Sequence, residues 1–197
     1  MAVWTKLQAK EKVQEWQSVG DVVVFTNGCF DVLHRGHIDY LTEAKALGGK
    51  LIIGLNSDAS VLLLKGEGRP VQPEEDRAVI IDALHIVDGV TIFSEETPLE
   101  LIKELKPDIL VKGGDYTEDS VVGSDEVRNN GGSVKILPFR KGCGTTLLLK
   151  KIQGERKYQI SEKLLIKFPD NETSKEKVLF FEDCFLTSPS LKAINII

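Results

Sequence analysis

The chain has 197 residues, 42% of them hydrophobic, which suits one α/β domain with additions better than two full domains. Lysine and arginine number 25 against 30 aspartates and glutamates, so the net charge of −5 supplies no basic field for DNA or RNA. No apolar run reaches the roughly 18 residues of a membrane-spanning helix. Three widely separated cysteines form no disulfide framework. These features predict a cytoplasmic protein with no nucleic-acid or membrane partner.

Helical and strand-like patterns alternate along most of the chain. Residues 5–18 have the apolar spacing of a surface helix. The strands predicted after it are residues 21–26, 50–55, 89–93, 108–112 and 133–138, and the predicted helices are residues 36–47, 74–86, 97–105, 124–130 and 145–153. Five strands separated by helices indicate an α/β fold, a five-stranded parallel sheet with right-handed crossovers and helices on both faces. The connection at 57–73 is too rich in glycine to predict regular structure.

The pattern changes after Ile152, so the sequence divides into three predicted parts. These are an N-terminal helix at 1–20, a main domain at 21–154 and a C-terminal extension at 155–197. In the extension, apolar and polar residues first alternate weakly, a polar stretch follows, and an apolar patch comes after it. A cover for the sheet edge, an oligomer contact and a substrate lid are all open roles for it.

The segment at 25–37, FTNGCFDVLHRGH, follows a buried-strand pattern and carries two histidines. His34 and His37 lie three residues apart, with Gly36 between them, where the apolar spacing of a helix begins. Free N–H groups and the positive end of a helix dipole favour an anion there, and imidazole donors add directional hydrogen bonds. Open α/β sheets bind ligands at the carboxyl ends of their strands, so the segment predicts a phosphate site.

A metal site at these histidines lacks further ligands. The remaining histidine, His85, lies in an apolar helical stretch, and Cys29, Cys143 and Cys184 have no paired spacing. No metal ligand is therefore predicted from the protein itself.

The residues NGCFDVLHRGH resemble the HxGH signature of the cytidylyltransferase-like nucleotidyltransferases, whose sheet is Rossmann-like. The likeness continues through GLNSDASVLLLKGEGRPV, DRAVIIDALHIVDGV, TPLELIKELKPDILVKGGDY and LPFRKGCGTT. Together these segments resemble the adenylyltransferase domain of ADP-heptose synthases over about two-thirds of the chain. The resemblance implies transfer of AMP from ATP, with Mg²⁺, to heptose 1-phosphate in lipopolysaccharide precursor synthesis. It also implies a separate heptose kinase and a homodimer or higher homo-oligomer.

The resemblance assigns roles to individual residues. His34 and His37 contact the α and β phosphates, while Lys65 and Arg77 supply positive charge to the phosphates or the acceptor. Without the motif, Lys65 would be a solvated loop lysine and Arg77 a surface ion pair with a neighbouring carboxylate. The other predicted nucleotide-binding residues are Cys29, Phe30, Gly113, Asp115, Arg140, Gly142, Gly144, Thr145 and Thr146. The other predicted acceptor-binding residues are Asn56, Asp58 and Arg69.

The sequence departs from the family pattern at Gly144, where relatives usually have serine. One hydroxyl is lost while the backbone amide remains, so slower rather than absent activity is expected. Two other functions stay open: a CTP-dependent enzyme acting on glycerol 3-phosphate or a similar phosphorylated alcohol, and an idle nucleotide-binding sensor or scaffold.

Overall fold

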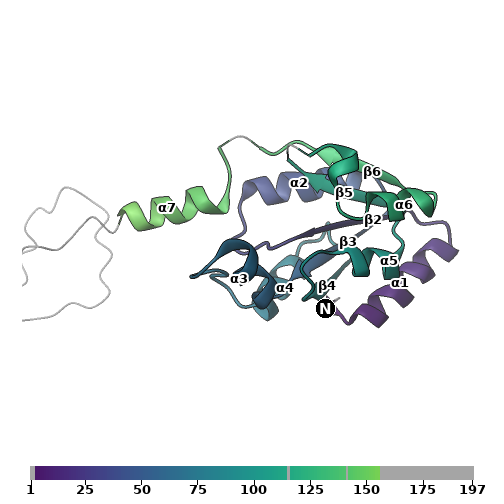
Figure 1. Cartoon of the computed structure of the whole chain (residues 1–197), viewed down its shortest axis with the longest axis horizontal. Helices are drawn as coiled ribbons and strands as arrows, with labels where there is room; N and C mark the ends of the chain where they lie inside the picture. The colour runs from purple at the N-terminus through teal and green to yellow at the C-terminus, as the bar shows by residue number, and fades with distance from the viewer. Residues whose placement is uncertain (1–2, 115, 141, 156–197) are drawn as a thin grey trace, which may run out of the picture. The chain divides into compact units, whose positions relative to one another are not determined.

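The computed structural model describes residues 3–114, 116–140 and 142–155 (Figure 1). The strands are β1 (Val3–Trp4), β2 (Val23–Gly28), β3 (Lys50–Asn56), β4 (Gly89–Phe93), β5 (Ile109–Gly113) and β6 (Ser133–Leu137). The helices are α1 (Lys6–Ser18), α2 (Arg35–Ala46), α3 (Asp58–Lys65), α4 (Glu74–Asp82), α5 (Leu99–Leu105), α6 (Ser124–Asn129) and α7 (Thr145–Glu155), with a 3₁₀ turn η1 (Glu118–Ser120). Apart from residue 155, the predicted extension lies outside the described residues.

All strand pairs in the sheet are parallel, and the order is β1-β4-β3-β2-β5-β6. The predicted α/β fold with a parallel sheet is confirmed, with six strands where five were predicted. Strand β1 has two residues, too few to show any periodicity in the sequence. It pairs with β4, where a Cβ on Gly89 would lie 2.0 Å from the Trp4 ring, so only glycine leaves room for the indole.

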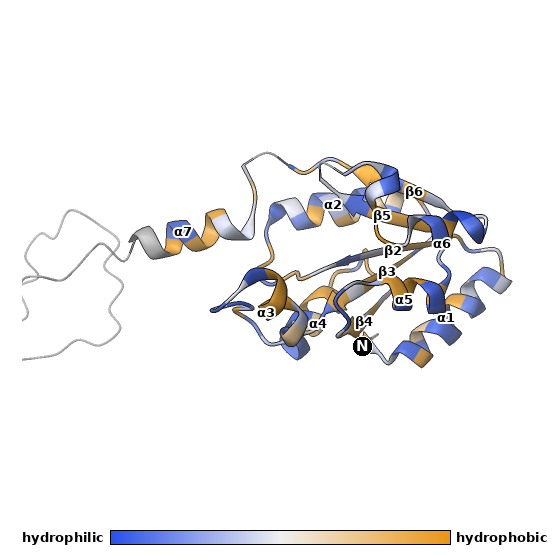
Figure 2. Ribbon diagram, in the orientation of Figure 1, coloured by the Kyte–Doolittle hydropathy of each residue, from blue (hydrophilic) through white to orange (hydrophobic). Residues whose placement is uncertain are grey.

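Two hydrophobic cores cover the two faces of the sheet, as the predicted arrangement of helices requires. One core contains Val13 of α1, Phe25 of β2 and Leu101 of α5, and the other contains Val24 of β2 and Leu41 of α2. Side chains alternate along a strand, so neighbours in β2 enter opposite cores. Figure 2 shows hydrophilic and hydrophobic residues alternating around α1 and α2, as expected for helices with one face on the sheet.

The connection predicted to be irregular at 57–73 contains a helix. Ser57 caps α3, because its side-chain oxygen accepts a hydrogen bond from the Ser60 N–H at 3.3 Å. The helix ends at Gly66, which has φ of 84°. The glycines therefore mark the end of the helix rather than its absence. None of the helices in the described part of the chain is both long and apolar enough to cross a membrane.

Strand β2 lies at the point where the strand order reverses, between β3 and β5. In open α/β sheets this reversal leaves a crevice outside the carboxyl ends of the strands. The histidine segment follows β2 directly, so the fold places it at that crevice.

Candidate active site

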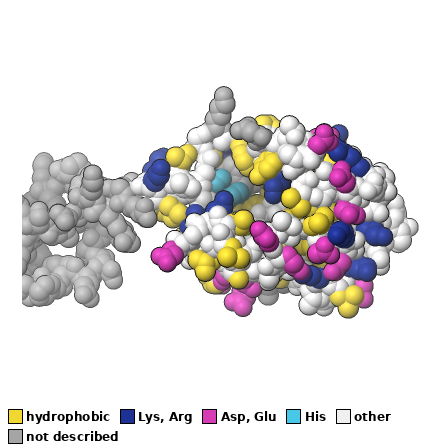
Figure 3. All heavy atoms as spheres, viewed as in Figure 1, with side chains coloured by type: hydrophobic (Ala, Val, Ile, Leu, Met, Phe, Trp, Pro, Cys, Tyr) yellow, Lys and Arg dark blue, Asp and Glu magenta, His cyan; other side chains and the backbone are white. Residues whose placement is uncertain are grey.

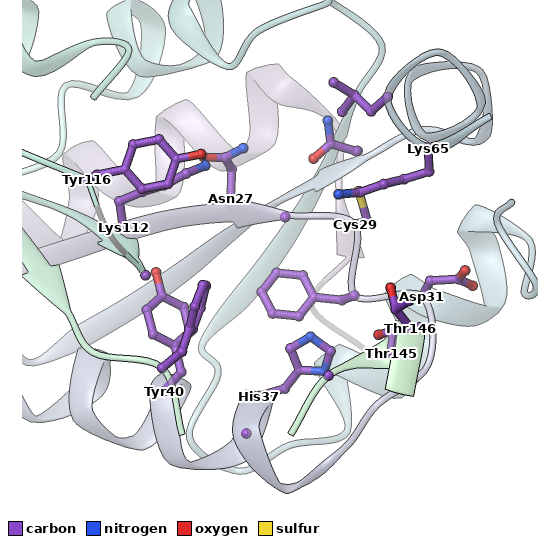
Figure 4. Close-up of a pocket in the computed structure, with 18 of the residues that line it drawn as sticks. Asn27, Cys29, Asp31, His37, Tyr40, Lys65, Lys112, Tyr116, Thr145 and Thr146 are labelled. Carbon is purple, nitrogen blue, oxygen red and sulfur yellow. The ribbon is translucent and has the colours of Figure 1, made fainter. Parts of the chain in front are cut away.

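A cavity of about 770 Å³ opens at the carboxyl ends of β2, β3 and β5. Figure 3 shows histidine side chains within a hollow bordered by lysine and arginine side chains, and Figure 4 shows residues that line it. The volume is in the range of small-molecule sites. Predicted site residues that line it are Cys29, Phe30, His34, His37, Asn56, Lys65, Arg69, Gly113, Arg140, Gly144, Thr145 and Thr146.

His34 and His37 form a stacked pair at the start of α2. Their ring centroids lie 3.8 Å apart with planes 16° from parallel. Both Nδ1 atoms are buried and have no hydrogen-bond partner among the described residues. Burial lowers the pKa of both histidines, and with the neighbouring His34 it brings the pKa of His37 to about 4. Neutral imidazoles with unpartnered nitrogens at a helix N-terminus are suited to donate to a phosphate.

Glycine at position 36 lets the loop before α7 lie against this pair. A Cβ on Gly36 would stand 3.1 Å from the His34 ring and 3.0 Å from the Cys143 Cβ. These contacts are tight, so a larger residue would displace the imidazole or the loop. The glycine between the histidines therefore has a packing reason as well as a conformational one.

Asp31 fixes the loop that connects β2 to α2. Its buried carboxylate accepts hydrogen bonds from Arg69 Nε at 2.6 Å and from the backbone N–H groups of Val71 and Gln72 at 2.8 and 3.0 Å. Burial opposes ionisation, but these donors outweigh it and hold the pKa of Asp31 below its ordinary value. Arg69 lines the cavity, and its guanidinium is bound to this carboxylate.

Arg77 does not line the cavity and is fully buried. Its guanidinium donates to the carbonyls of Cys29, Asn56 and Gln72 at 2.6, 2.9 and 3.0 Å. It also donates to the Asp58 carboxylate at 2.7 Å.

This placement corrects two expectations for Arg77. The surface ion pair is wrong, and the guanidinium is committed to protein groups rather than directed at the phosphates. Asp58, expected to contact the acceptor, pairs with Arg77 and does not line the cavity either. Together they join the end of β3 to the loop after β2.

A second helix N-terminus faces the histidines. Thr145 and Thr146 open α7 and line the cavity, and Thr145 Oγ1 donates to the Val32 carbonyl at 3.4 Å. Arg140 lines the cavity and donates to Asp39 at 2.7 Å. Gly142 turns the loop with φ of 77° and does not line the cavity. Asp115 lies outside the described residues.

The lining residues that sequence reasoning missed include Asn27, Tyr40, Lys112 and Phe139. The Tyr40 hydroxyl lies 2.6 Å from Thr26 Oγ1, and burial raises the pKa of Tyr40 to about 12. The Phe139 ring covers Gly113 and Gly114, where a Cβ would meet it at 2.4 and 2.8 Å.

Lys112 donates to Asn27 Oδ1 at 3.1 Å. Asn27 lies in the segment NGCFDVLHRGH and Lys112 in the segment that ends VKGGDY, so both stand in parts of the sequence that resemble the family. Their contact depends on β2 pairing with β5, which the sequence did not reveal.

Among the described residues, no group of three or more His, Cys, Asp or Glu side chains could hold a metal ion. Asp31, the buried carboxylate in the cavity wall, is already bound to Arg69 and two backbone N–H groups.

We expect Gly144→Ser to keep its stability and to raise turnover modestly. A Cβ at Gly144 meets nothing within 4 Å, and its φ is outside the left-handed region, so serine fits without strain. The added hydroxyl donor is worth about 1 kcal/mol, or a few-fold in rate. Steady-state kinetics and thermal melting of the same variant check this. A stable variant that no longer binds nucleotide would show that this loop does not contact phosphate.

The cytidylyltransferase-like family matches residues 25–178. The chain is 55% identical over 141 residues to the bifunctional protein HldE of Wolinella succinogenes, covering 72% of this chain and 29% of that protein. It is 50% identical over 153 residues to the bifunctional protein HldE of Salmonella arizonae, covering 78% of this chain and 32% of that protein. The chain thus spans about a third of the length of these relatives.

Among solved structures, a lipopolysaccharide core biosynthesis protein from Thermoplasma volcanium superposes with a TM-score of 0.52 at 32% identity. The match covers 63% of this chain and all of that one.

Proposed function

The chain belongs to the cytidylyltransferase-like family of nucleotidyltransferases, and we propose that it transfers AMP from ATP to a heptose 1-phosphate, releasing pyrophosphate. The product is ADP-heptose, a precursor of the lipopolysaccharide core. The likeness to bifunctional HldE proteins and to the adenylyltransferase domain of ADP-heptose synthases supports this acceptor. A cytoplasmic location, a homo-oligomeric state and a separate heptose kinase belong to the same proposal.

One observation carries the proposal: the two stacked imidazoles with unpartnered Nδ1 atoms, placed between the N-termini of α2 and α7. Both helices exceed two turns, and the first turn of α2 holds no acidic residue that would repel an anion. Backbone N–H groups at helix starts, imidazole donors and a nearby lysine suit a triphosphate better than a neutral ligand.

The reaction requires alignment and charge stabilisation rather than a nucleophile from the protein. A phosphate oxygen of the acceptor attacks the α-phosphorus, the bond to the β-phosphate oxygen breaks, and its electron pair leaves with pyrophosphate. His34 and His37 would donate to the α and β phosphate oxygens as charge moves toward the leaving group. Lys65, at the end of α3, would approach the phosphates from the opposite wall. The Arg77 and Asp31 contacts hold these elements in place.

Replacing Lys65 with alanine should lower kcat/KM by on the order of 10²-fold, because it removes a cation that faces the transferred phosphate. No ion pair engages Lys65 among the described residues, so the fold loses little. Steady-state kinetics and chemical denaturation on the same preparation measure both effects. An unchanged rate would return Lys65 to the role of a solvated loop lysine.

Pyrophosphate release with matched substrate pairs tests the proposed function. ATP with heptose 1-phosphate should give turnover well above ATP alone. Higher turnover from CTP with glycerol 3-phosphate would identify a cytidylyltransferase instead. Nucleotide binding with no pyrophosphate release from any pair would identify a sensor or scaffold.

A further inference from the structure

Lys112 and Asn27 lie near the carboxyl ends of β5 and β2 and form a hydrogen-bonded pair. The reaction described above does not use this pair. Lys112 Nζ donates to Asn27 Oδ1 at 3.1 Å and lies 6.0 Å from the centroid of the Tyr116 ring. Within the described residues, no carboxylate forms an ion pair with this ammonium. An ammonium has three N–H donors, so Lys112 retains donors for a ligand in the cavity that it lines.

The pair lies on the opposite side of β2 from the histidines. Phe25 and Leu110, two residues before Asn27 and Lys112, belong to the core that contains α1 and α5. Side chains alternate along strands, so Asn27 and Lys112 face that same side. Figure 4 shows Lys112, Asn27 and Tyr116 on one side of the strand ribbon and Tyr40 and His37 on the other.

The end of β2 thus divides the cavity into two lobes. We call the first the α2 lobe, which holds the two histidines, and the second the α5 lobe. The α5 lobe is lined by Asn27, Thr97, Pro98, Lys112, Tyr116 and Ser120. Gly113, which the resemblance assigns to the nucleotide, follows Val111 of the core on the α2 side by two residues and therefore faces the α2 lobe. The proposed function thus places the whole of ATP in the α2 lobe and the acceptor, beyond its reacting phosphate, in the α5 lobe.

The chemistry of the α5 lobe matches a polyhydroxylated ligand. It combines an ammonium, a carboxamide and three hydroxyls with an aromatic ring and a proline. Several convergent donors and acceptors beside an apolar face suit a sugar ring, which has hydroxyls on its rim and C–H groups on its faces. A small phosphorylated alcohol would leave most of these polar groups without partners.

We propose that the α5 lobe binds the sugar of the acceptor and that Lys112 is its specificity-determining residue, donating hydrogen bonds to sugar hydroxyls. The inference rests on the proposed function and adds which residue selects the acceptor. Asn27 holds the ammonium toward the cavity, and Lys65 keeps its proposed place at the transferred phosphate. Burial lowers the pKa of Lys112, and the positive charge of Lys65 acts in the same direction. Hydrogen bonds from a half-buried ammonium are stronger than those from a solvated one.

The test compares Lys112→Met, which keeps the length of the side chain without its donors, with Lys112→Arg, which keeps charge and donors. Lys135→Met is the matched control, because Lys135 is an exposed lysine of β6 that does not line the cavity. Isothermal titration measures binding of the α,β-methylene analogue of ATP, and then of heptose 1-phosphate and glycerol 3-phosphate in its presence. Steady-state KM values for ATP and heptose 1-phosphate are measured on the same variants.

Lys112→Met should weaken heptose 1-phosphate binding and raise its KM by at least about tenfold. Binding of the ATP analogue and of glycerol 3-phosphate should change less than about twofold, Lys112→Arg should recover part of the loss, and Lys135→Met should match the parent. Equal losses for both acceptors, or a loss for the nucleotide, would overturn the inference. Unchanged binding of heptose 1-phosphate in Lys112→Met would also overturn it. A parent protein that releases no pyrophosphate with heptose 1-phosphate would instead refute the proposed function.

Discussion

His37→Ala should lower kcat by on the order of 10²–10³-fold while the protein stays folded. The variant removes an imidazole whose Nδ1 is buried without a hydrogen-bond partner, so the fold loses no internal hydrogen bond from that atom. The transition state, by contrast, loses a donor directed at its charge.

Steady-state kinetics with ATP and heptose 1-phosphate, together with urea denaturation, measure the two effects separately. His85→Ala is the matched control, because His85 is exposed and lies outside the cavity. It should match the parent in both measurements. Turnover of His37→Ala close to that of the parent would contradict the assignment of the histidine pair to the phosphates.

Arg77→Met should cost about 3 kcal/mol or more in the free energy of unfolding. The guanidinium is fully buried and serves the carbonyls of Cys29, Asn56 and Gln72 as well as the Asp58 carboxylate. Methionine fills much of the volume but leaves these acceptors without their donor. Turnover should fall as well, because the hydrogen bond from Arg77 to the Cys29 carbonyl holds the loop that carries the histidines in place.

Arg128→Met provides the contrast. Arg128 also forms two ion pairs, with Glu118 and Asp119, but these are partly exposed at the surface. The free energy of unfolding of the Arg128→Met variant should differ from that of the parent by about 0.5 kcal/mol or less. Denaturation curves for both variants test the difference. An Arg77→Met variant as stable as the parent would contradict the structural role of this guanidinium.

Strands and helices that produce a local pattern of residues could be predicted from the sequence, whereas side-chain contacts between distant residues could not. The run from Val22 to Phe25 indicated a buried strand because burial on both faces requires consecutive apolar residues, and the strand forms as expected. The histidine site followed from that strand and the helix after it, since both are local patterns. The short strand β1 carries no periodicity, and α3 was hidden by the glycines that end it.

The position of Arg77 was not predicted because most of its partners, Cys29, Asn56 and Asp58, are distant in sequence. The nearby acidic residues Glu74 and Asp76 suggested a surface ion pair, whereas its bound carbonyls come from Cys29, Asn56 and Gln72. Lys112 was overlooked for the same reason, because only the pairing of β2 with β5 brings it to Asn27. Contacts of this kind depend on tertiary structure, and no local pattern of residues encodes them.

In the proposed reaction, the α-phosphoryl group moves to the sugar phosphate, carried as AMP. Parallel reactions of the protein with heptose 1-phosphate and ATP labelled with ³²P at either the α or the γ position test it most directly. We expect the α label to appear in a nucleotide sugar and the γ label in pyrophosphate. The γ label in the sugar product, or the α label in free AMP alone, would contradict the account.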